Sequence, residues 1–235
     1  MPVVMPTLPA SLPGRRRARW EVLGRVPYGE AEALQRALRE EVKRGGGEDR
    51  LLLLEHPHVY TLGRNAVRGD VLASDEWLAA RGIEIAECDR GGQVTYHGPG
   101  QLVGYPIVNL SPDRRDVRRY VRDLQAVLVR TLADFGVAAV PRAEQAFIGC
   151  WVGEEKIASI GVHLSRWVTT HGFALNVTTD LSYFAGIVPC GLSGIGVTSI
   201  ERLTGRRPAL ATVASRCAAH FGDVFGREMI GPREA

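Results

Sequence analysis

The block that most constrains the fold runs from Phe147 to Thr178. It is rich in β-branched and aromatic residues and is broken at intervals by glycines. That pattern predicts three antiparallel strands or hairpins rather than parallel strands joined by crossover helices. A chain with such a block fits an α+β arrangement, with a mixed and largely antiparallel sheet and packed helices, better than a doubly wound sheet.

Helical and strand-like segments alternate irregularly around this block. Leu34, Leu38 and Val42 recur four residues apart and predict an amphipathic helix from Gly29 to Gly45. Further helices are expected after the cap Ser74 up to Gly82, across residues 116–136, and across residues 209–225. Strands are expected in the runs RLLLLEH, IEIAECD and LVGYPIVNL.

Length and charge limit the function classes. A chain of 235 residues suits one domain, with residues 1–19, which are rich in proline and arginine, as a disordered tail and residues 20–235 as a single catalytic domain. The net charge of +3 gives little reason to expect nucleic acid as a partner. No apolar run approaches the roughly 20 residues of a membrane span, so no membrane association is expected. Four cysteines without metal-like spacing or a secretory context indicate a cytoplasmic protein with reduced thiols.

The stretch DRGGQVTYHGPGQ, from Asp89 to Gln101, holds four glycines within thirteen residues. It follows a strand-like run, as a dinucleotide-binding loop would, but the next element reads as a strand and not a helix. A phosphate site of that kind depends on a helix N-terminus, so this interpretation is weak. The chain also contains no G-x-x-x-x-G-K-[ST] motif, which excludes a P-loop.

A metal centre is not expected. There is no H-E-x-x-H motif, and His56 and His58 flank a proline that breaks strand regularity. A third ligand is not evident beside them. A structural turn is the favoured interpretation of this pair.

Cys190 differs from the other cysteines. Cys150 and Cys217 lie in apolar runs and read as core, and Cys88 reads as core or as the wall of a pocket. Cys190 stands between a proline and a glycine in IVPCGLSGIG, an irregular turn without apolar periodicity. On the residues alone, a nucleophile and a small buried side chain are about equally good interpretations of Cys190.

A nucleophilic cysteine needs a nearby cation or base. His97, His163 and His171 are candidates, and so is Lys156, one of only two lysines in the chain. Lysine sheds its proton when desolvated, whereas arginine effectively does not. The competing interpretation is a solvated lysine at a hairpin tip beside Glu154 and Glu155, and the residues alone favour that interpretation slightly.

Four blocks resemble the LipB-type lipoyl/octanoyl transferases of lipoate assembly. They are EHPHVYTLGR, RGGQVTYHGPGQLVGYPIVNL, KIASIGVHLSRWVTTHGFALNV, and IVPCG followed by VTSI, in the family's order over roughly residues 20–225. The resemblance implies the fold of biotin and lipoate protein ligases around an acyl-binding tunnel. It departs from the family at His58, where many members carry a second proline.

The resemblance also implies a reaction and its partners. An octanoyl group would pass from octanoyl-acyl carrier protein to a cysteine, and then to a lysine of a lipoyl domain, without a cofactor. The implied acceptors are the lipoyl domains of 2-oxoacid dehydrogenase complexes and the glycine cleavage H protein. Cys190 would form the thioester, and Lys156 would favour the thiolate and shuttle protons. The residues implied to line the substrate pocket are Arg90, Gly91, Gly92, Gln93, Val94, Thr95, Tyr96, His97, Ser159, Ile160, Gly161, Gly172, Phe173 and Ala174.

Three other functions compete with this one. An ATP-dependent lipoate or biotin ligase would share the fold but needs a nucleotide site and no nucleophilic cysteine. A non-catalytic acyl-binding relative would keep the tunnel and lose Cys190 or Lys156. A cysteine hydrolase would require a Cys–His–Asn arrangement, which the sequence does not show clearly.

Overall fold

The computed structural model describes residues 15–112, 114–142, 144, 147–188 and 196–231. The large sheet crosses the molecule in the order β12 (Arg227–Ile230), β1 (Arg16–Arg25), β2 (Asp49–Glu55), β6 (Gln101–Ile107), β10 (Val168–Asn176), β9 (Glu155–Ser165), β8 (Gly149–Val152) and β7 (Val140–Arg142). Strand β11 (Gly196–Val197) pairs with β9 off this path. The pairs of β1 with β12 and β2 are parallel, as is the pair of β11 with β9, and the other ladders are antiparallel. The predicted mixed, largely antiparallel sheet is therefore confirmed.

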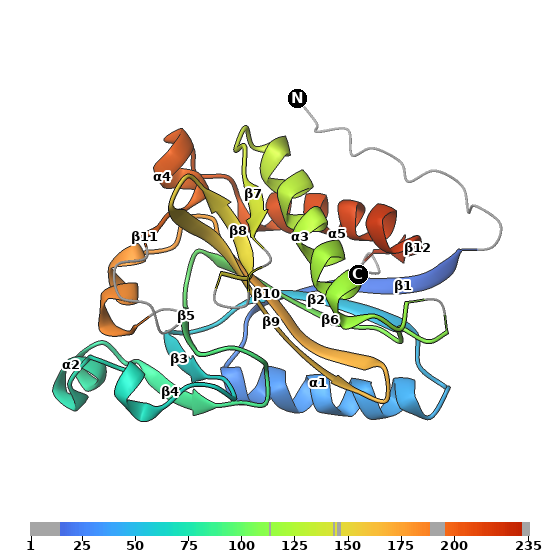
Figure 1. The fold of residues 1–235 in the computed structure, drawn as a ribbon, viewed down its shortest axis with the longest axis horizontal. Coiled ribbons are helices and arrows are strands. Elements are labelled where there is room, and N and C mark those ends of the chain that lie inside the picture. The colour runs from blue at the N-terminus through green and yellow to red at the C-terminus, as the bar shows by residue number, and fades with distance from the viewer. Residues whose placement is uncertain (1–14, 113, 143, 145–146, 189–195, 232–235) are drawn as a thin grey trace.

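Helices cover both faces of this sheet. Figure 1 shows α3 (Val117–Asp134) and α5 (Leu210–Phe225) on one face and α1 (Tyr28–Lys43) on the other. Side chains of β2 alternate between the faces: Leu51 and Leu53 join the core under α3 and α5, and Leu52 and Leu54 join the core under α1. A strand buried on both sides reads as a continuous apolar run, which is why RLLLLEH predicts a strand.

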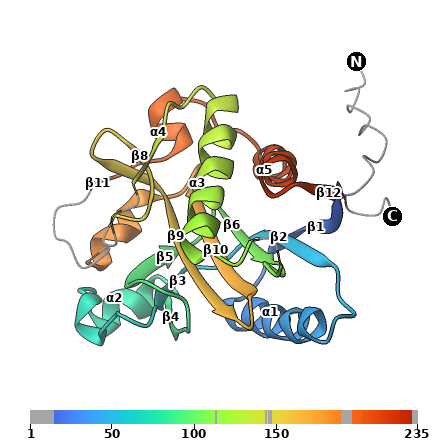
Figure 2. The ribbon, with the colours of Figure 1, turned by 45° about the vertical axis from the view of Figure 1, so that its right-hand side comes forward.

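A second, three-stranded sheet lies beside the first. Its order is β4 (Glu84–Glu87), β3 (Val59–Leu62) and β5 (Val94–His97). Three short helices accompany it: η1 (Arg68–Asp70), α2 (Asp75–Ala80) and η2 (Leu181–Gly186). Figure 2 shows α2, β3 and β4 on the opposite side of the molecule from α5. It has its own apolar core, which brings Phe184 and Ile187 onto the strands.

The elements expected from the sequence are largely present. The helices α1, α2, α3 and α5 lie where they were predicted, and Ser74 caps α2 by accepting a hydrogen bond from the backbone N–H of Trp77. The block Phe147–Thr178 forms the antiparallel strands β8, β9 and β10. A short helix α4 (Ile200–Thr204) was not anticipated.

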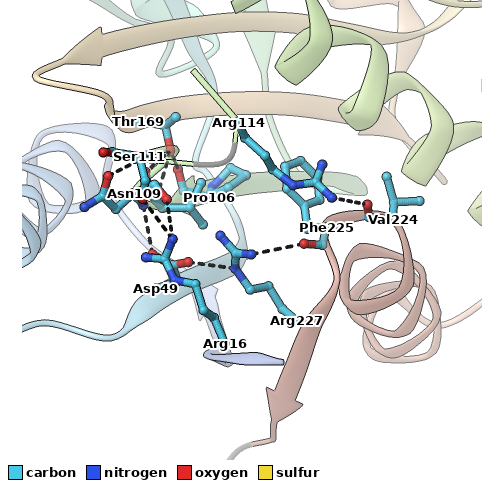
Figure 3. Close-up of polar contacts among 11 residues, drawn as sticks. Arg16, Asp49, Pro106, Asn109, Ser111, Arg114, Thr169, Val224, Phe225 and Arg227 are labelled. Carbon is cyan, nitrogen blue, oxygen red and sulfur yellow. Dashed lines mark hydrogen bonds and ion pairs between the residues drawn. The ribbon is translucent and has the colours of Figure 1, made fainter. Parts of the chain in front are cut away.

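The first strand begins earlier than the predicted tail boundary at Arg19. Arg16 to Arg19 already belong to β1, because they pair in parallel with Arg227 to Ile230 of β12. The chain ends of the sheet are held together by charge, as Figure 3 shows: Nε of Arg227 donates to Oδ2 of Asp49 at 2.8 Å, and Arg16 approaches the same carboxylate. Both Arg227 and Asp49 are buried. The expected tail otherwise lies in residues 1–14, outside the described residues.

Candidate active site

One cavity of about 600 Å³ is lined by Lys156 and by all but one of the predicted pocket residues. It lies between β9, β10, the loop before β5 and the first turns of α3. Lys156 lines it together with the predicted pocket residues Arg90, Gly91, Gly92, Gln93, Val94, Thr95, His97, Ser159, Ile160, Gly161, Gly172, Phe173 and Ala174. Three blocks that are separated in the sequence therefore meet around one space.

Tyr96 is the predicted pocket residue that does not line this cavity. Its side chain belongs to the core of the small sheet, where its ring stacks on Tyr183 with centroids 5.2 Å apart. Its hydroxyl bonds Nδ1 of His58 at 2.8 Å. Tyr96 supports the strand that carries its neighbours Thr95 and His97, and it makes no wall of the cavity itself.

Arg90 fastens the glycine loop to both sheets. Its guanidinium donates to the backbone oxygen of Thr61 at 2.7 Å, to Oγ1 of Thr61 at 2.9 Å, and to the backbone oxygen of Gly91 at 3.2 Å. The backbone N–H of Gly91 donates in turn to the oxygen of Val162 on β9 at 3.0 Å. The loop is therefore held in place by β3 on one side and β9 on the other.

The glycines around this loop allow backbone to pack on backbone. A Cβ added to Gly63 would lie 2.5 Å from the oxygen of Gly92, and one added to Gly161 would lie 2.8 Å from the oxygen of Gly91. Both distances are too short for real contacts, so any side chain at either position would push the loop away. Glycine density here serves a close approach of three backbone segments.

Asp89 forms a latch at the start of the same loop. Its Oδ1 lies 2.6 Å from Nε2 of His171 on β10, and its Oδ2 lies 3.7 Å from Nε2 of His163 on β9. Burial alone would raise the pKa of the Asp89 carboxyl, but the hydrogen bond from His171 brings that pKa below its ordinary value. Glu32, Asp89 and His171 also bring one potential metal-ligand atom each to within 4.8 Å of one another. We interpret this group as a latch, because Asp89 and His171 already bond each other.

Lys156 is buried, with 5% of its surface exposed. Its Nζ lies 5.3 Å from the centroid of the Trp151 ring on β8, and the side chain lines the cavity. The interpretation as a solvated lysine at a hairpin tip is wrong: Glu154 lies in the turn and pairs with Arg142 in solvent, whereas Lys156 points inward. Successive side chains of a strand point to opposite faces, so Lys156 and its neighbour Glu155 lie on opposite sides of β9.

Cys190 lies outside the described residues, which end at Val188 before it and resume at Gly196 after it. Ile187 bridges Val71, and the N–H of Val188 donates to the oxygen of Asp70. After the interval 189–195, Val197 pairs with Lys156 and lines the cavity. The first described residues after Cys190 therefore lie in a strand paired with the one that carries Lys156.

The cysteines in the described part of the chain do not line this cavity. Cys150 and Cys217 are fully buried, and burial raises the pKa of each thiol to about 12. Both were predicted to be core residues, and this is confirmed. Sγ of Cys88 donates to the backbone oxygen of Leu62 at 3.3 Å.

His56 and His58 occupy a structural turn, as predicted. His56 is fully buried and uses both ring nitrogens: Nδ1 bonds the oxygen of Val26 and Nε2 bonds the hydroxyl of Tyr105, each at 2.7 Å. Burial lowers the pKa of His56 to about 4, so the ring is neutral. The two imidazoles bond different partners, and neither bonds the other.

Sequence reasoning missed several residues of this cavity. Tyr28, Tyr105 and Asn176 line it, and so does His171, which the sequence offered only as a possible partner of the nucleophilic cysteine. His171 and Asn176 lie in the HGFALN segment that also holds three predicted pocket residues, so that signal was present. Tyr28, at the start of α1, offers no signal in the sequence.

Known proteins resemble this chain in sequence and in fold. The family described as "Lipoyl protein ligase A/B catalytic domain" matches residues 27–222. An octanoyltransferase of Solibacter usitatus is 53% identical over 210 residues, covering 88% of this chain and 93% of the relative. An octanoyltransferase of Myxococcus xanthus is 52% identical over 214 residues, covering 88% of this chain and 59% of the relative.

Solved structures resemble the fold at lower identity. Lipoate-protein ligase A bound with ATP superposes with a TM-score of 0.72 at 18% identity, covering 93% of this chain and 90% of that chain. Biotin protein ligase from Aquifex aeolicus reaches a TM-score of 0.50 at 11% identity, covering 90% and 69%. These likenesses show the fold alone. The sequence match places the chain in the lipoyl protein ligase A/B catalytic-domain family, among its octanoyltransferases.

Proposed function

We propose that this protein transfers an octanoyl group to a lysine of lipoyl domains, as the first step in building protein-bound lipoate. The observation that carries the proposal is the buried Lys156 in a mainly apolar cavity, beside the segment that returns from Cys190. About half of the residues are identical to octanoyltransferases across most of the chain. The enzyme is therefore an acyltransferase.

In the first half of the reaction, the thiolate of Cys190 attacks the thioester carbonyl of octanoyl-acyl carrier protein. A new carbon–sulfur bond forms and the bond to the carrier's sulfur breaks. Lys156 as an ammonium favours the Cys190 thiolate and gives its proton to the departing sulfur. Thioester is exchanged for thioester, so the step is nearly balanced and needs no nucleotide.

In the second half, the amine of the acceptor lysine attacks the Cys190 thioester. The carbon–nitrogen bond forms, the carbon–sulfur bond breaks, and neutral Lys156 takes the surplus proton from the nitrogen. The enzyme returns to a thiolate beside an ammonium. The amide is more stable than the thioester, which draws the cycle forward. One covalent intermediate shared by two substrates gives ping-pong kinetics.

The partners follow from this chemistry. The donor is octanoyl-acyl carrier protein, and the acceptors are lipoyl domains of 2-oxoacid dehydrogenase complexes and the glycine cleavage H protein. No helix in the described ranges is long and apolar enough to cross a membrane. We place the reaction in the cytoplasm, where free thiols such as those of Cys88, Cys150 and Cys217 stay reduced.

An ATP-dependent ligase is the second candidate, because a lipoate ligase bound with ATP shares the fold. The two differ in their activated acyl group. A ligase forms an adenylate and needs no nucleophilic thiol, whereas the transferase carries the acyl group on Cys190. A non-catalytic acyl-binding protein would form neither.

The deciding experiment incubates the protein with octanoyl-acyl carrier protein and no ATP, and reads the intact mass. We expect a gain equal to one octanoyl group in the native protein and none in Cys190→Ala. Acylation that persists in Cys190→Ala would remove Cys190 as the nucleophile. Lys156→Arg keeps the charge and blocks deprotonation, so it should slow octanoyl transfer to a lipoyl domain. Transfer at the native rate by Lys156→Arg would remove the proton-shuttle role.

A further inference from the structure

His97 presents one free ring nitrogen to the cavity. Its side chain lines the cavity, and only 6% of the residue surface is exposed to bulk solvent. Nδ1 lies 2.7 Å from Oε1 of Gln101. No residue in the described ranges bonds Nε2. This atom is not fully enclosed by protein either, because it is absent from the set of buried polar atoms without a partner, so the cavity leaves room beside it.

Backbone carbonyls fix the direction of every hydrogen bond behind this ring. A carbonyl oxygen only accepts, so the Gln101 nitrogen that bonds the oxygen of Tyr96 at 3.1 Å is the amide NH₂. The same nitrogen donates to Oδ1 of Asn176 at 3.0 Å. The orientation of Asn176 is fixed in the same way, because its nitrogen donates to the oxygen of Thr198 at 3.0 Å.

The tautomer of His97 follows from this chain. Oε1 is the only atom of the Gln101 amide left to face the ring, and it accepts, so Nδ1 of His97 carries the hydrogen. Burial lowers the pKa of His97 well below its ordinary value, so the ring is neutral. A neutral ring protonated at Nδ1 has its lone pair at Nε2.

The chain of hydrogen bonds also ties His97 to the catalytic lysine. It ends at Thr198, whose N–H donates to the backbone oxygen of Lys156 at 3.0 Å. Asn176 and Lys156 both line the cavity. His97 on β5 and Lys156 on β9 are therefore connected through Gln101 on β6, Asn176 on β10 and Thr198, which directly follows β11.

We propose that Nε2 of His97 accepts a hydrogen bond from the attacking amine of the acceptor lysine and so holds that amine in the cavity. The proposal rests on the proposed transferase function and gives His97, already expected in the substrate pocket, a specific role in the second half-reaction. His97 transfers no proton in this role: the N–H stays on the amine, and Lys156 takes the surplus proton after attack.

The chemistry of the two half-reactions selects the amine as the ligand. Acylation of Cys190 brings together a thiolate, a carbonyl oxygen and a departing sulfur, none of which offers a hydrogen to Nε2, and the proton that Lys156 carries goes to the departing sulfur. The amine of the second half carries N–H groups, and its rate of attack depends on its orientation. Because Nε2 of His97 stays unprotonated near neutral pH, it can hold the amine through an N–H group without taking the proton that Lys156 removes.

Two substitutions at one position separate support from contact. In His97→Asn the side-chain NH₂ can still donate to Gln101, but nothing reaches the place of Nε2. In His97→Gln the amide oxygen can reach that place. Acylation by octanoyl-acyl carrier protein should slow much less than transfer in His97→Asn, because Nε2 meets no reacting atom in that step. Single-turnover transfer to a lipoyl domain should fall by about 10²-fold in His97→Asn, as expected for a misplaced reactant, and recover to within about tenfold in His97→Gln.

A third variant supplies a pH readout. In Gln101→Glu the carboxylate accepts from Nδ1, carries a charge and stabilises the doubly protonated ring, which puts a hydrogen on Nε2. The amine-transfer step should then be lost at a higher pH than in the native enzyme, while the pH profile of acylation stays unchanged. An unshifted transfer profile would overturn the proposal.

The matched control is His56→Asn. His56 lies beside His97, with ring centroids 5.7 Å apart, is also buried, and has both nitrogens bonded. Its loss should lower stability without changing the ratio of the two half-reaction rates. Equal slowing of both halves in His97→Asn would overturn the amine contact. Failure of the native protein to form an acyl-enzyme would instead remove the transferase function itself.

Discussion

The ring of Phe173 occupies the space in which Gly104 would carry a Cβ. The two residues are cross-strand partners on β10 and β6, and an added methyl group on Gly104 would overlap the ring. Phe173 also lines the cavity. One wall of the cavity is therefore positioned by the absence of a side chain on the neighbouring strand.

Gly104→Ala should displace this ring toward the cavity, which is the open space beside it. We expect a loss of about 1–3 kcal/mol in the free energy of unfolding, the usual cost of overpacking a core, measured by urea denaturation. Acylation by an octanoyl donor should slow more than acylation by a butyryl donor. Gly29→Ala is the control, because a Cβ there meets no atom within 4 Å. An unchanged preference between the two donors would show that Phe173 does not limit the acyl chain.

Gly161→Ala should lift the glycine loop from β9, because its Cβ would lie 2.8 Å from the oxygen of Gly91 and 3.2 Å from Cδ of Arg90. A displacement of about 1 Å at a reacting centre costs about 10²-fold in rate, and we expect a loss of this order in formation of the acyl-enzyme. The rate of acyl-enzyme formation would be measured by quenching the reaction at successive times and recording the intact mass. Native acylation rates in a folded Gly161→Ala protein would mean that the loop does not hold the donor.

Asp49→Ala should destabilise the protein strongly, because it leaves the buried guanidinium of Arg227 without its counter-charge. The expected loss is about 3–5 kcal/mol in the free energy of unfolding. Arg207→Ala removes an exposed pair with Glu201 and should cost less than about 1 kcal/mol. Similar costs for the two variants in chemical denaturation would contradict the importance of burial.

Stability should fall as the pH drops from about 6.5 toward 4. The unfolded chain protonates His56 near pH 6.5, whereas burial keeps its pKa at about 4 in the folded protein. Between these values the unfolded state binds one more proton, so the free energy of unfolding decreases by about 1.4 kcal/mol per pH unit from this group. His97, whose pKa is lowered in the same direction, adds to the slope. His56→Gln should reduce the slope by one proton, and an unchanged slope would contradict the neutral buried ring.

The fold was largely readable from the sequence because its strongest signals are local. Apolar runs, helix periodicity, the cap at Ser74 and the glycine stops mark elements that the structure contains. The start of β1 was not readable, because Arg16 to Arg19 resemble a basic tail until β12 pairs with them. That contact joins the two ends of the described chain and leaves no trace in either segment alone.

The cavity was grouped from the sequence through a resemblance, and its contacts needed the structure. Lys156 follows two glutamates, so its local sequence favours solvent, and only the direction of β9 places it inside. Asp89 and His171 are separated by 82 positions, and no spacing rule connects them. Tyr96 was grouped with its neighbours although its side chain belongs to the other core, because a motif names consecutive residues while a strand turns alternate ones apart.

Where the walls of the cavity depend on glycines, substitution of those glycines can narrow the cavity but cannot widen it. Every substitution at Gly63, Gly104 or Gly161 adds atoms where the backbone or an aromatic ring already stands. Substitutions at these glycines can therefore shift the acyl preference only toward shorter or slimmer acyl groups. Acceptance of bulkier groups would have to arise at residues with a side chain to lose, such as Phe173 or Ile160, which face the same cavity.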